Sequence, residues 1–293
     1  MPGLGSARAA ISVVNALPLG IGSAVGIDWP ARTRAYLAPT SRGGGPDRTS
    51  VEPAASATPI VRAAARLAGA RYGGSGNEHL HLVVRSTIPV ARGLKSSSAI
   101  GSSVVLATAR ALGSEPGPEE VARLSAEAGR AAAVSATGAF DDALAGLVPG
   151  GVVTDNRTRR ALRRLDVPVE LVAALWVPHR RHPRSPLVRE RFRREPALAR
   201  RAADAALAGD WARAMELNTG LVERAMGYRY GQIHERVRAA GAIASGVSGL
   251  GPAFVALAPR ERIPAVVRAL PGTGRRRSVA LFLGPRASTE DGA

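Results

Sequence analysis

The stretch that says most about the fold reads Pro89-Val90-Ala91-Arg92-Gly93-Leu94-Lys95-Ser96-Ser97-Ser98-Ala99. Before it, residues 79–86 alternate in polarity as a strand does. After it, residues 96–112 form a run of small and apolar side chains that predicts a buried helix. A glycine lets the backbone approach a ligand closely, and the start of a helix presents unpaired N–H groups and partial positive charge. The segment from Pro89 to Ala99 is therefore predicted to bind an anion such as the phosphates of a nucleotide.

The polar residues of this segment strengthen the prediction. Lys95 adds a mobile positive charge, the three serines that follow can cap the helix, and one hydroxyl could face a magnesium ion carried by the nucleotide. No stretch of the chain matches the P-loop pattern of Gly, four residues and Gly-Lys-Ser/Thr, so this would be a different phosphate loop. The alternative is an ordinary serine-capped helix. Glycine, lysine and three serines together favour phosphate binding.

A second candidate segment carries adjacent carboxylates, in Thr137-Gly138-Ala139-Phe140-Asp141-Asp142-Ala143, with Gly150-Gly151 downstream. Such a pair is common in turns, but a carboxylate can also act as a general base. Magnesium needs at least one carboxylate besides phosphate oxygens, and Glu127 on the predicted helix 119–134 is the best placed acid upstream. An exposed helical glutamate is the alternative for Glu127.

A third segment, rich in glycine, reads Gly246-Val247-Ser248-Gly249-Leu250-Gly251-Pro252-Ala253 and precedes an apolar strand. Gly249 and Gly251 are either turn residues or part of a binding site. Near the amino terminus, Asn15 and Asp28 flank another glycine-rich stretch. Each of these two residues is either a polar group for a substrate or a turn residue.

Composition limits the possible partners. The net charge of +17 would attract anionic metabolites and polyanions, but aromatic residues are only 4% of the chain, which argues against nucleic-acid binding by base stacking. Cysteine is absent, which excludes disulfides and thiolate chemistry. No apolar run approaches the roughly 18 residues of a membrane span, and residues 1–8 do not resemble a secretory signal. A cytoplasmic protein without membrane contact is the expectation.

The order of predicted elements indicates an α+β fold. Strands are expected at 7–14, 24–27, 33–37 and 170–177, helices at 60–69 and 197–240, and a small α/β sandwich at 246–290. Residues 39–46 read as a surface loop, and 286–293 as a frayed tail. We expect two lobes, at 1–165 with the phosphate loop and at 166–293 with the third glycine segment.

These three segments resemble, in the same order, the motifs of the galactokinase, homoserine kinase, mevalonate kinase and phosphomevalonate kinase superfamily. Lys95 replaces the glycine of the usual Gly-Leu-Gly-Ser-Ser-Ala. The resemblance implies an ATP-dependent kinase with two lobes, the first of a kind shared with a ribosomal protein domain and the second a ferredoxin-like α/β sandwich. It also implies that Ser97 faces magnesium and that Asp141 is the catalytic base, with Asp142 as the other choice.

The opening segments are similar to those of the archaeal type of shikimate kinase: Ser12-Val13-Val14-Asn15-Ala16, then Gly20-x-Gly22-x-Ala24-x-Gly26-Ile27-Asp28. This resemblance implies that the acceptor is shikimate, a small acid phosphorylated on its 3-hydroxyl. Arg92 is one candidate for the carboxylate of that acceptor. Homoserine kinase is the main alternative. A basic RNA-binding module, using the arginine-rich run 180–194, is an alternative from another class.

Overall fold

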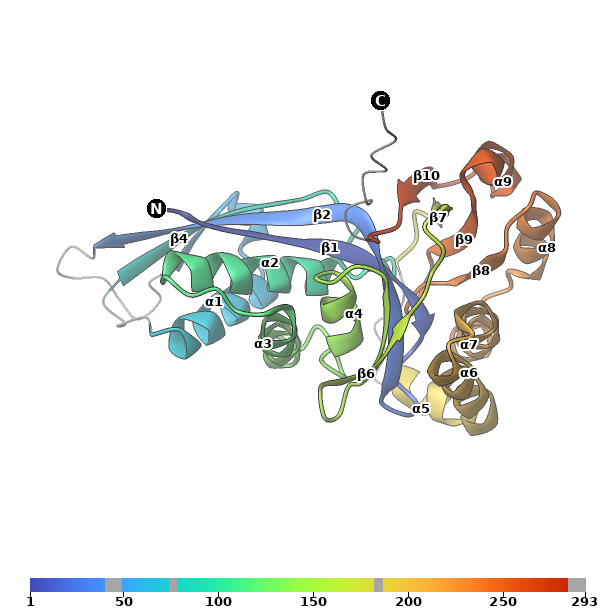
Figure 1. Ribbon diagram of the computed structural model, residues 1–293, viewed down its shortest axis with the longest axis horizontal. Helices are drawn as coiled ribbons and strands as arrows, with labels where there is room; N and C mark the ends of the chain where they lie inside the picture. The colour runs from blue at the N-terminus through green and yellow to red at the C-terminus, as the bar shows by residue number, and fades with distance from the viewer. Residues whose placement is uncertain (40–48, 74–77, 182–186, 284–293) are drawn as a thin grey trace, which may run out of the picture.

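The computed structural model describes residues 1–39, 49–73, 78–181 and 187–283. In these ranges the chain forms two β-sheets flanked by helices, lying next to each other along the long axis of the molecule (Figure 1). The α+β prediction is confirmed. The predicted loop, apart from Pro39, and the predicted tail lie outside the described residues.

The first sheet carries the amino-terminal half of the chain. In the described part of the chain its strands are β1 (Gly3–Val14), β2 (Ile21–Pro39), β3 (Thr49–Glu52), β4 (Glu78–Ser86), β5 (Gly151–Asp155) and β6 (Arg160–Leu165). The order is β3-β4-β2-β5-β6, with β1 also paired to β2, and the pairing of β3 with β4 is parallel. The short strand β3 was not predicted.

Strand β2 corrects the expectation of two separate strands at 24–27 and 33–37. It runs unbroken through Pro30, which has no N–H to donate. Pro30 pairs in register with Arg8, beside an irregularity between Arg8 and Ala10, where a proline is tolerated in a sheet. Pairing along both halves of β1 therefore keeps β2 continuous.

Helices cover one face of this sheet (Figure 1). Their bounds are η1 (Ala54–Ser56), α1 (Pro59–Arg71), α2 (Ser96–Ala111), α3 (Pro118–Ala131) and α4 (Phe140–Ala145). Helix α2 lies very close to β1, since a Cβ added to Gly5 would come within 2.0 Å of the Ser103 carbonyl oxygen. The small residues predicted to form a buried helix thus permit close contact with the sheet.

The second sheet contains, in the part described, the antiparallel strands β7 (Leu171–Val177), β8 (Ala244–Val247), β9 (Phe254–Pro259) and β10 (Arg275–Ala280). Its order β10-β7-β9-β8 is that of a ferredoxin-like sandwich, as predicted. The accompanying helices are α5 (Val188–Arg193), α6 (Pro196–Ala208), α7 (Trp211–Met226), α8 (Gly231–Ala239), η2 (Arg260–Arg262) and α9 (Ile263–Ala269).

The change from one sheet to the other falls between Leu165 and Leu171. One core cluster nevertheless includes Ile11 and Val153 from the first sheet and Leu175 and Leu257 from the second. The division at 165/166 therefore stays a prediction. Across the described ranges, no helix combines the length and apolar character that a membrane crossing requires.

Candidate active site

The predicted phosphate loop ends in a left-handed turn. Gly93 has φ +91°, and Lys95, the N-cap residue of α2, has φ 60°. The expectation that serines cap this helix is wrong, because no side chain makes a cap hydrogen bond. With its side chain buried, Leu94 can offer a ligand only its backbone, whereas Ser97 is half-buried. The loop thus leaves the first N–H groups of α2 without a side-chain cap.

The third glycine segment lies directly against this loop. A Cβ added to Gly93 would lie 2.0 Å from the Ser248 carbonyl oxygen, and one added to Gly249 would lie 3.1 Å from Lys95 Nζ. The Ser248 hydroxyl donates to the Gly93 carbonyl at 2.7 Å. Gly251, at φ +71°, closes the turn by donating to the Ser248 carbonyl at 2.8 Å. Two segments about 155 residues apart therefore form one backbone surface around Lys95.

Asp142 joins this surface to helix α4. Its Oδ1 lies 3.0 Å from Lys95 Nζ, an ion pair that lacks the angular geometry of a hydrogen bond. Both side chains are only 11% exposed, so water screens the pair weakly. Asp142 therefore neutralises and orients the lysine of the phosphate loop.

Asp141 lies in a different environment. Its Oδ1 accepts from Asn156 Nδ2 at 2.9 Å, and its N–H donates to Asn156 Oδ1 at 3.1 Å. Burial and the neighbouring Asp142 raise the pKa of Asp141 to about 7, although Lys95 and the Asn156 hydrogen bond act in the opposite direction. A carboxyl with a pKa near neutrality is suited to exchange a proton with a substrate.

Gly22 on β2 lies against this carboxyl. A Cβ at Gly22 would lie 2.4 Å from Asp141 Oδ2 and 2.7 Å from Asn156 Nδ2. Only glycine fits at position 22, since any side chain there would displace the Asp141–Asn156 pair.

Asn15 links the end of β1 to the third glycine segment. Its side-chain amide donates to the Gly249 carbonyl at 3.3 Å, and its backbone N–H donates to Asn218 Oδ1 at 2.8 Å. Asn15 and Gly249 are thus brought next to the phosphate loop, and their predicted role in substrate binding stays a prediction. The contacts that Asn15 makes here are to the protein itself.

Two predicted residues lie apart from this group. Asp28 is exposed and pairs with Arg8 at 3.2 Å, about 20 Å along an extended strand from Gly22. Glu127 is 48% exposed and lies 3.6 Å from Arg159. Its placement fits the alternative of an exposed helical glutamate, and neither residue makes a contact with Asp141 or Lys95 among the interactions of the described residues.

Arg92 turns toward the second lobe. Its guanidinium donates to the His179 carbonyl oxygen. Burial and the nearby Arg181 lower the pKa of Arg92. From the arginine-rich run, Arg180 donates to the Tyr230 hydroxyl at 2.9 Å and stacks over Tyr228. Residues 182–186 of that run lie outside the described residues.

Sequence reasoning missed Asn156 and Asn218. Asn156 stands in Asp155-Asn156-Arg157-Thr158, which reads as an ordinary turn, and Asn218 lies within an amphipathic helix. Nothing local distinguishes either residue, because each acts on a group far away in the sequence. Only pairing of β2 with β5 and packing of α7 against β1 could have revealed them.

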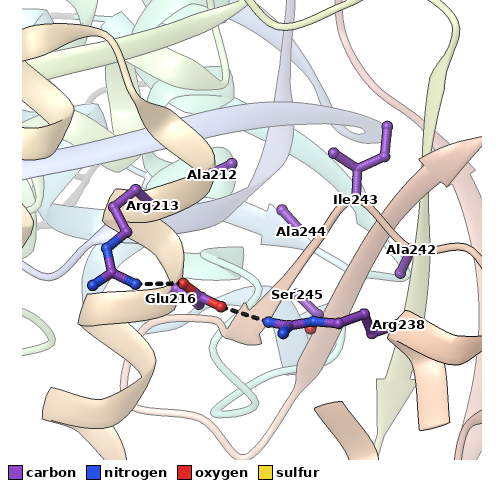
Figure 2. A pocket seen from close by; sticks show the side chains of 8 residues that line it. All are labelled: Ala212, Arg213, Glu216, Arg238, Ala242, Ile243, Ala244 and Ser245. Atoms are coloured by element: carbon purple, nitrogen blue, oxygen red, sulfur yellow. Dashed lines mark hydrogen bonds and ion pairs between the residues drawn. The ribbon is translucent and has the colours of Figure 1, made fainter. Parts of the chain in front are cut away.

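A cavity of about 170 Å³ lies elsewhere, between α7, α8 and β8. Figure 2 shows Arg213 and Arg238 pointing at Glu216, at 2.7 Å and 2.6 Å. The other lining side chains shown are mostly apolar. Glu216 is thus held by two arginines, in contrast to the buried Asp141.

Comparison with known proteins gives two family matches. Residues 59–150 match the model of the GHMP kinases N terminal domain, and residues 199–276 match the model of the GHMP kinases C terminal domain. The first match contains the phosphate loop and both aspartates, and the second contains the third glycine segment.

Curated relatives match over almost the full chain. A shikimate kinase of Halobacterium salinarum is 35% identical, over 96% of this chain and 98% of that protein. A shikimate kinase of Archaeoglobus fulgidus is 33% identical, over 92% and 89%. Among solved structures, a homoserine kinase from Cytophaga hutchinsonii superposes with a TM-score of 0.70 at 18% identity, covering 96% of each chain. At that identity the structural likeness shows the fold alone.

Proposed function

Because this chain belongs to the GHMP kinase family, we propose that it phosphorylates the 3-hydroxyl of shikimate with ATP, giving shikimate 3-phosphate and ADP. The observation that carries the proposal is Asp141, buried, with a pKa of about 7, beside the Lys95–Asp142 pair of the phosphate loop. The relatives named shikimate kinase match this chain almost from end to end, and they point to shikimate as the acceptor.

The phosphate loop fits a nucleotide. A side chain at Gly93 would clash with the Ser248 carbonyl, and Gly249 has φ +60°, so both positions favour glycine and leave the backbone open to a ligand. Lys95 supplies positive charge, and the uncapped start of α2 supplies N–H donors. We assign Pro89 to Ala99 to the phosphates of ATP.

Magnesium would accompany the nucleotide. It would neutralise charge that develops on the transferred phosphoryl group. The half-buried Ser97 hydroxyl, at the start of α2, is the residue that we assign to it. Hard cations of this kind keep several waters and are held by phosphate oxygens and one or two carboxylates. Glu127 would have to leave its ion pair with Arg159 to take part.

Asp141 would act on the acceptor. In its ionised form it accepts the proton of the acceptor hydroxyl, whose oxygen forms a bond to the γ-phosphorus while the bond to the β,γ-bridging oxygen breaks. ADP leaves with the electron pair of that bond. Asp142 is occupied by Lys95, which favours Asp141 as the base. Positioning and charge neutralisation supply most of the acceleration in such reactions.

Two alternative functions can be distinguished from shikimate phosphorylation. A homoserine kinase would have the same fold, and the likeness to the solved homoserine kinase structure concerns the fold alone. A non-catalytic RNA-binding module would have no use for a buried base beside a phosphate loop. The predicted cytoplasmic location and the absence of membrane contact accompany the proposal as expectations from the sequence.

The test is coupled ADP release by the purified protein with ATP and magnesium, comparing shikimate, homoserine, mevalonate and no acceptor. We expect turnover with shikimate alone. Turnover with homoserine alone would support the kinase activity but contradict shikimate as the acceptor. No turnover with any acceptor, together with salt-sensitive RNA binding, would favour the binding module.

A further inference from the structure

Arg157 lies in the turn between β5 and β6, immediately after the asparagine that holds Asp141. This turn lies against the one joining β1 to β2, because the Asn156 N–H donates to the Gly20 carbonyl at 2.8 Å. In Figure 1 both turns lie toward the lower edge of the molecule. We propose that Arg157 binds the carboxylate of the acceptor, so that it selects acids as substrates. This inference rests on the proposed kinase function.

The Arg157 side chain lies close against Gly20. A Cβ added to Gly20 would lie 2.7 Å from Arg157 Nε and 2.9 Å from its Cγ. Gly20 has φ +82°, a conformation that glycine adopts without strain. The side chain therefore lies across the glycine instead of extending away from the turn, and this holds the guanidinium beside the start of β2.

The same short stretch of chain also contacts the catalytic carboxyl. Gly22, two residues after Gly20, is the residue whose Cβ would meet Asp141 Oδ2. Residues two apart in a chain lie at most about 7 Å from each other, the value for a fully extended backbone. Arg157 thus lies beside Gly20, and Asp141 lies beside Gly22, two residues further along the same segment. An acid built on one six-membered ring could reach both residues, with its hydroxyl at Asp141 and its carboxylate at Arg157.

The guanidinium of Arg157 is available for a ligand. It is exposed, and in the described parts of the chain it has no hydrogen-bond or ion-pair partner. The neighbouring acid Asp155 accepts from the Arg157 backbone N–H at 2.8 Å and from the Thr158 hydroxyl at 2.9 Å, and the nearby Arg157 charge helps to lower the pKa of Asp155 without an ion pair between the side chains. By contrast, Arg159 in the same turn pairs with Glu127. A planar guanidinium without a partner is well suited to bind a carboxylate through two parallel hydrogen bonds.

Arg92, the arginine suggested by the sequence, is a weaker choice. Its guanidinium is engaged by the His179 carbonyl on the second lobe, and Arg181 lies near it. It belongs to the phosphate loop and thus to the nucleotide side of the site. Arg157 is the arginine that the contacts link to Asp141, through Asn156 and through Gly20 and Gly22.

The test compares wild-type protein with Arg157→Ala and Arg157→Lys, using shikimate and its methyl ester as acceptors. Arg160→Ala is the matched control, since it removes an exposed arginine from the neighbouring strand. For Arg157→Ala we expect kcat/KM for shikimate to fall by about 10- to 150-fold, the loss typical of a hydrogen bond to a charged group. The KM for ATP should stay unchanged, and Arg157→Lys should recover part of the loss.

The ester distinguishes recognition from a structural effect. Wild-type protein should prefer the acid to the ester, and Arg157→Ala should lose that preference. An equal loss for both acceptors, or an unchanged preference in Arg157→Ala, would overturn the proposal while leaving the kinase function intact. If wild-type protein phosphorylates only an acceptor that has no carboxylate, both the shikimate assignment and this inference are wrong.

Discussion

Charged side chains form a cluster in two regions of this protein, and the two clusters differ in whether every carboxylate has an arginine or lysine as its partner. At the cavity between α7, α8 and β8, Glu216 is bound by Arg213 and Arg238, and all three side chains are at least 39% exposed. Hydrogen bonds from Arg213 keep the pKa of Glu216 below its usual range, although burial opposes this. At the candidate active site, Lys95 faces two buried carboxylates and pairs with only one.

This difference separates a structural cluster from a reactive one. An exposed, fully paired carboxylate stays ionised and contributes little to stability or chemistry. A buried carboxyl beside another carboxylate has a raised pKa and can exchange protons near neutral pH.

The largest effect is expected for Asp141→Asn. Asparagine cannot accept the proton of the acceptor hydroxyl, so turnover should fall roughly a hundred- to ten-thousandfold, while ATP binding stays largely intact. Steady-state ADP release and nucleotide titration would measure the two quantities. Unchanged turnover would instead make Asp142 the base.

The same variant tests the raised pKa through stability. Folding raises the pKa of Asp141 from about 4 to about 7, so ionisation costs stability as the pH rises through that range. Asp141→Asn should therefore raise the Tm at pH 8 and change it little at pH 4. Equal changes at both values would contradict a raised pKa.

The next effect is expected for Gly22→Ala. The added methyl group would collide with the Asp141 carboxyl and Asn156, so turnover should fall at least about tenfold, with a loss of roughly 1–3 kcal/mol in stability. Gly69→Ala is the control, because nothing lies within 4 Å of the added Cβ on α1. It should leave turnover unchanged and add about 0.4–1 kcal/mol of stability. Thermal unfolding and ADP release would separate the two variants.

A smaller change is expected in the pH profile of Asn156→Ala. The Asn156 hydrogen bond lowers the pKa of Asp141, and its loss should raise that pKa further. Since the base must be ionised, kcat/KM of the wild type should decrease as the pH falls below about 7. In the variant this decrease, the acidic limb of the pH profile, should begin at a higher pH. A limb that moves to lower pH would contradict the assignment.

The smallest effect is expected for Glu216→Gln. Removing the two exposed ion pairs should change the free energy of unfolding by less than about 1 kcal/mol and leave turnover with shikimate unaffected. Urea unfolding and ADP release would measure both. A strong loss of turnover would show that the cavity is coupled to the reaction and would break the comparison.

The sequence predicted much of the fold and part of the site. The strand, glycine loop and small-residue helix around Lys95 are local patterns, and the two aspartates follow a recognisable glycine segment. Continuity of β2 through Pro30 could not be predicted in this way, because it depends on pairing with β1. The predicted serine cap is wrong for a related reason, since the left-handed turn at Lys95 makes Lys95 the N-cap residue and places all three serines inside the helix.

The amino-acid sequence alone defines the chemical groups and their order: an anion-binding loop, a carboxylate pair and a glycine segment. Each is encoded within about a dozen residues, because backbone freedom and helix starts are local properties. Tertiary packing defines which carboxyl is buried without a cation of its own. Asp141 and Asp142 are neighbours in the chain, but α4 directs one to Asn156 and the other to Lys95. Electrostatic environment depends on burial and on groups brought from distant segments, and folding alone brings these together.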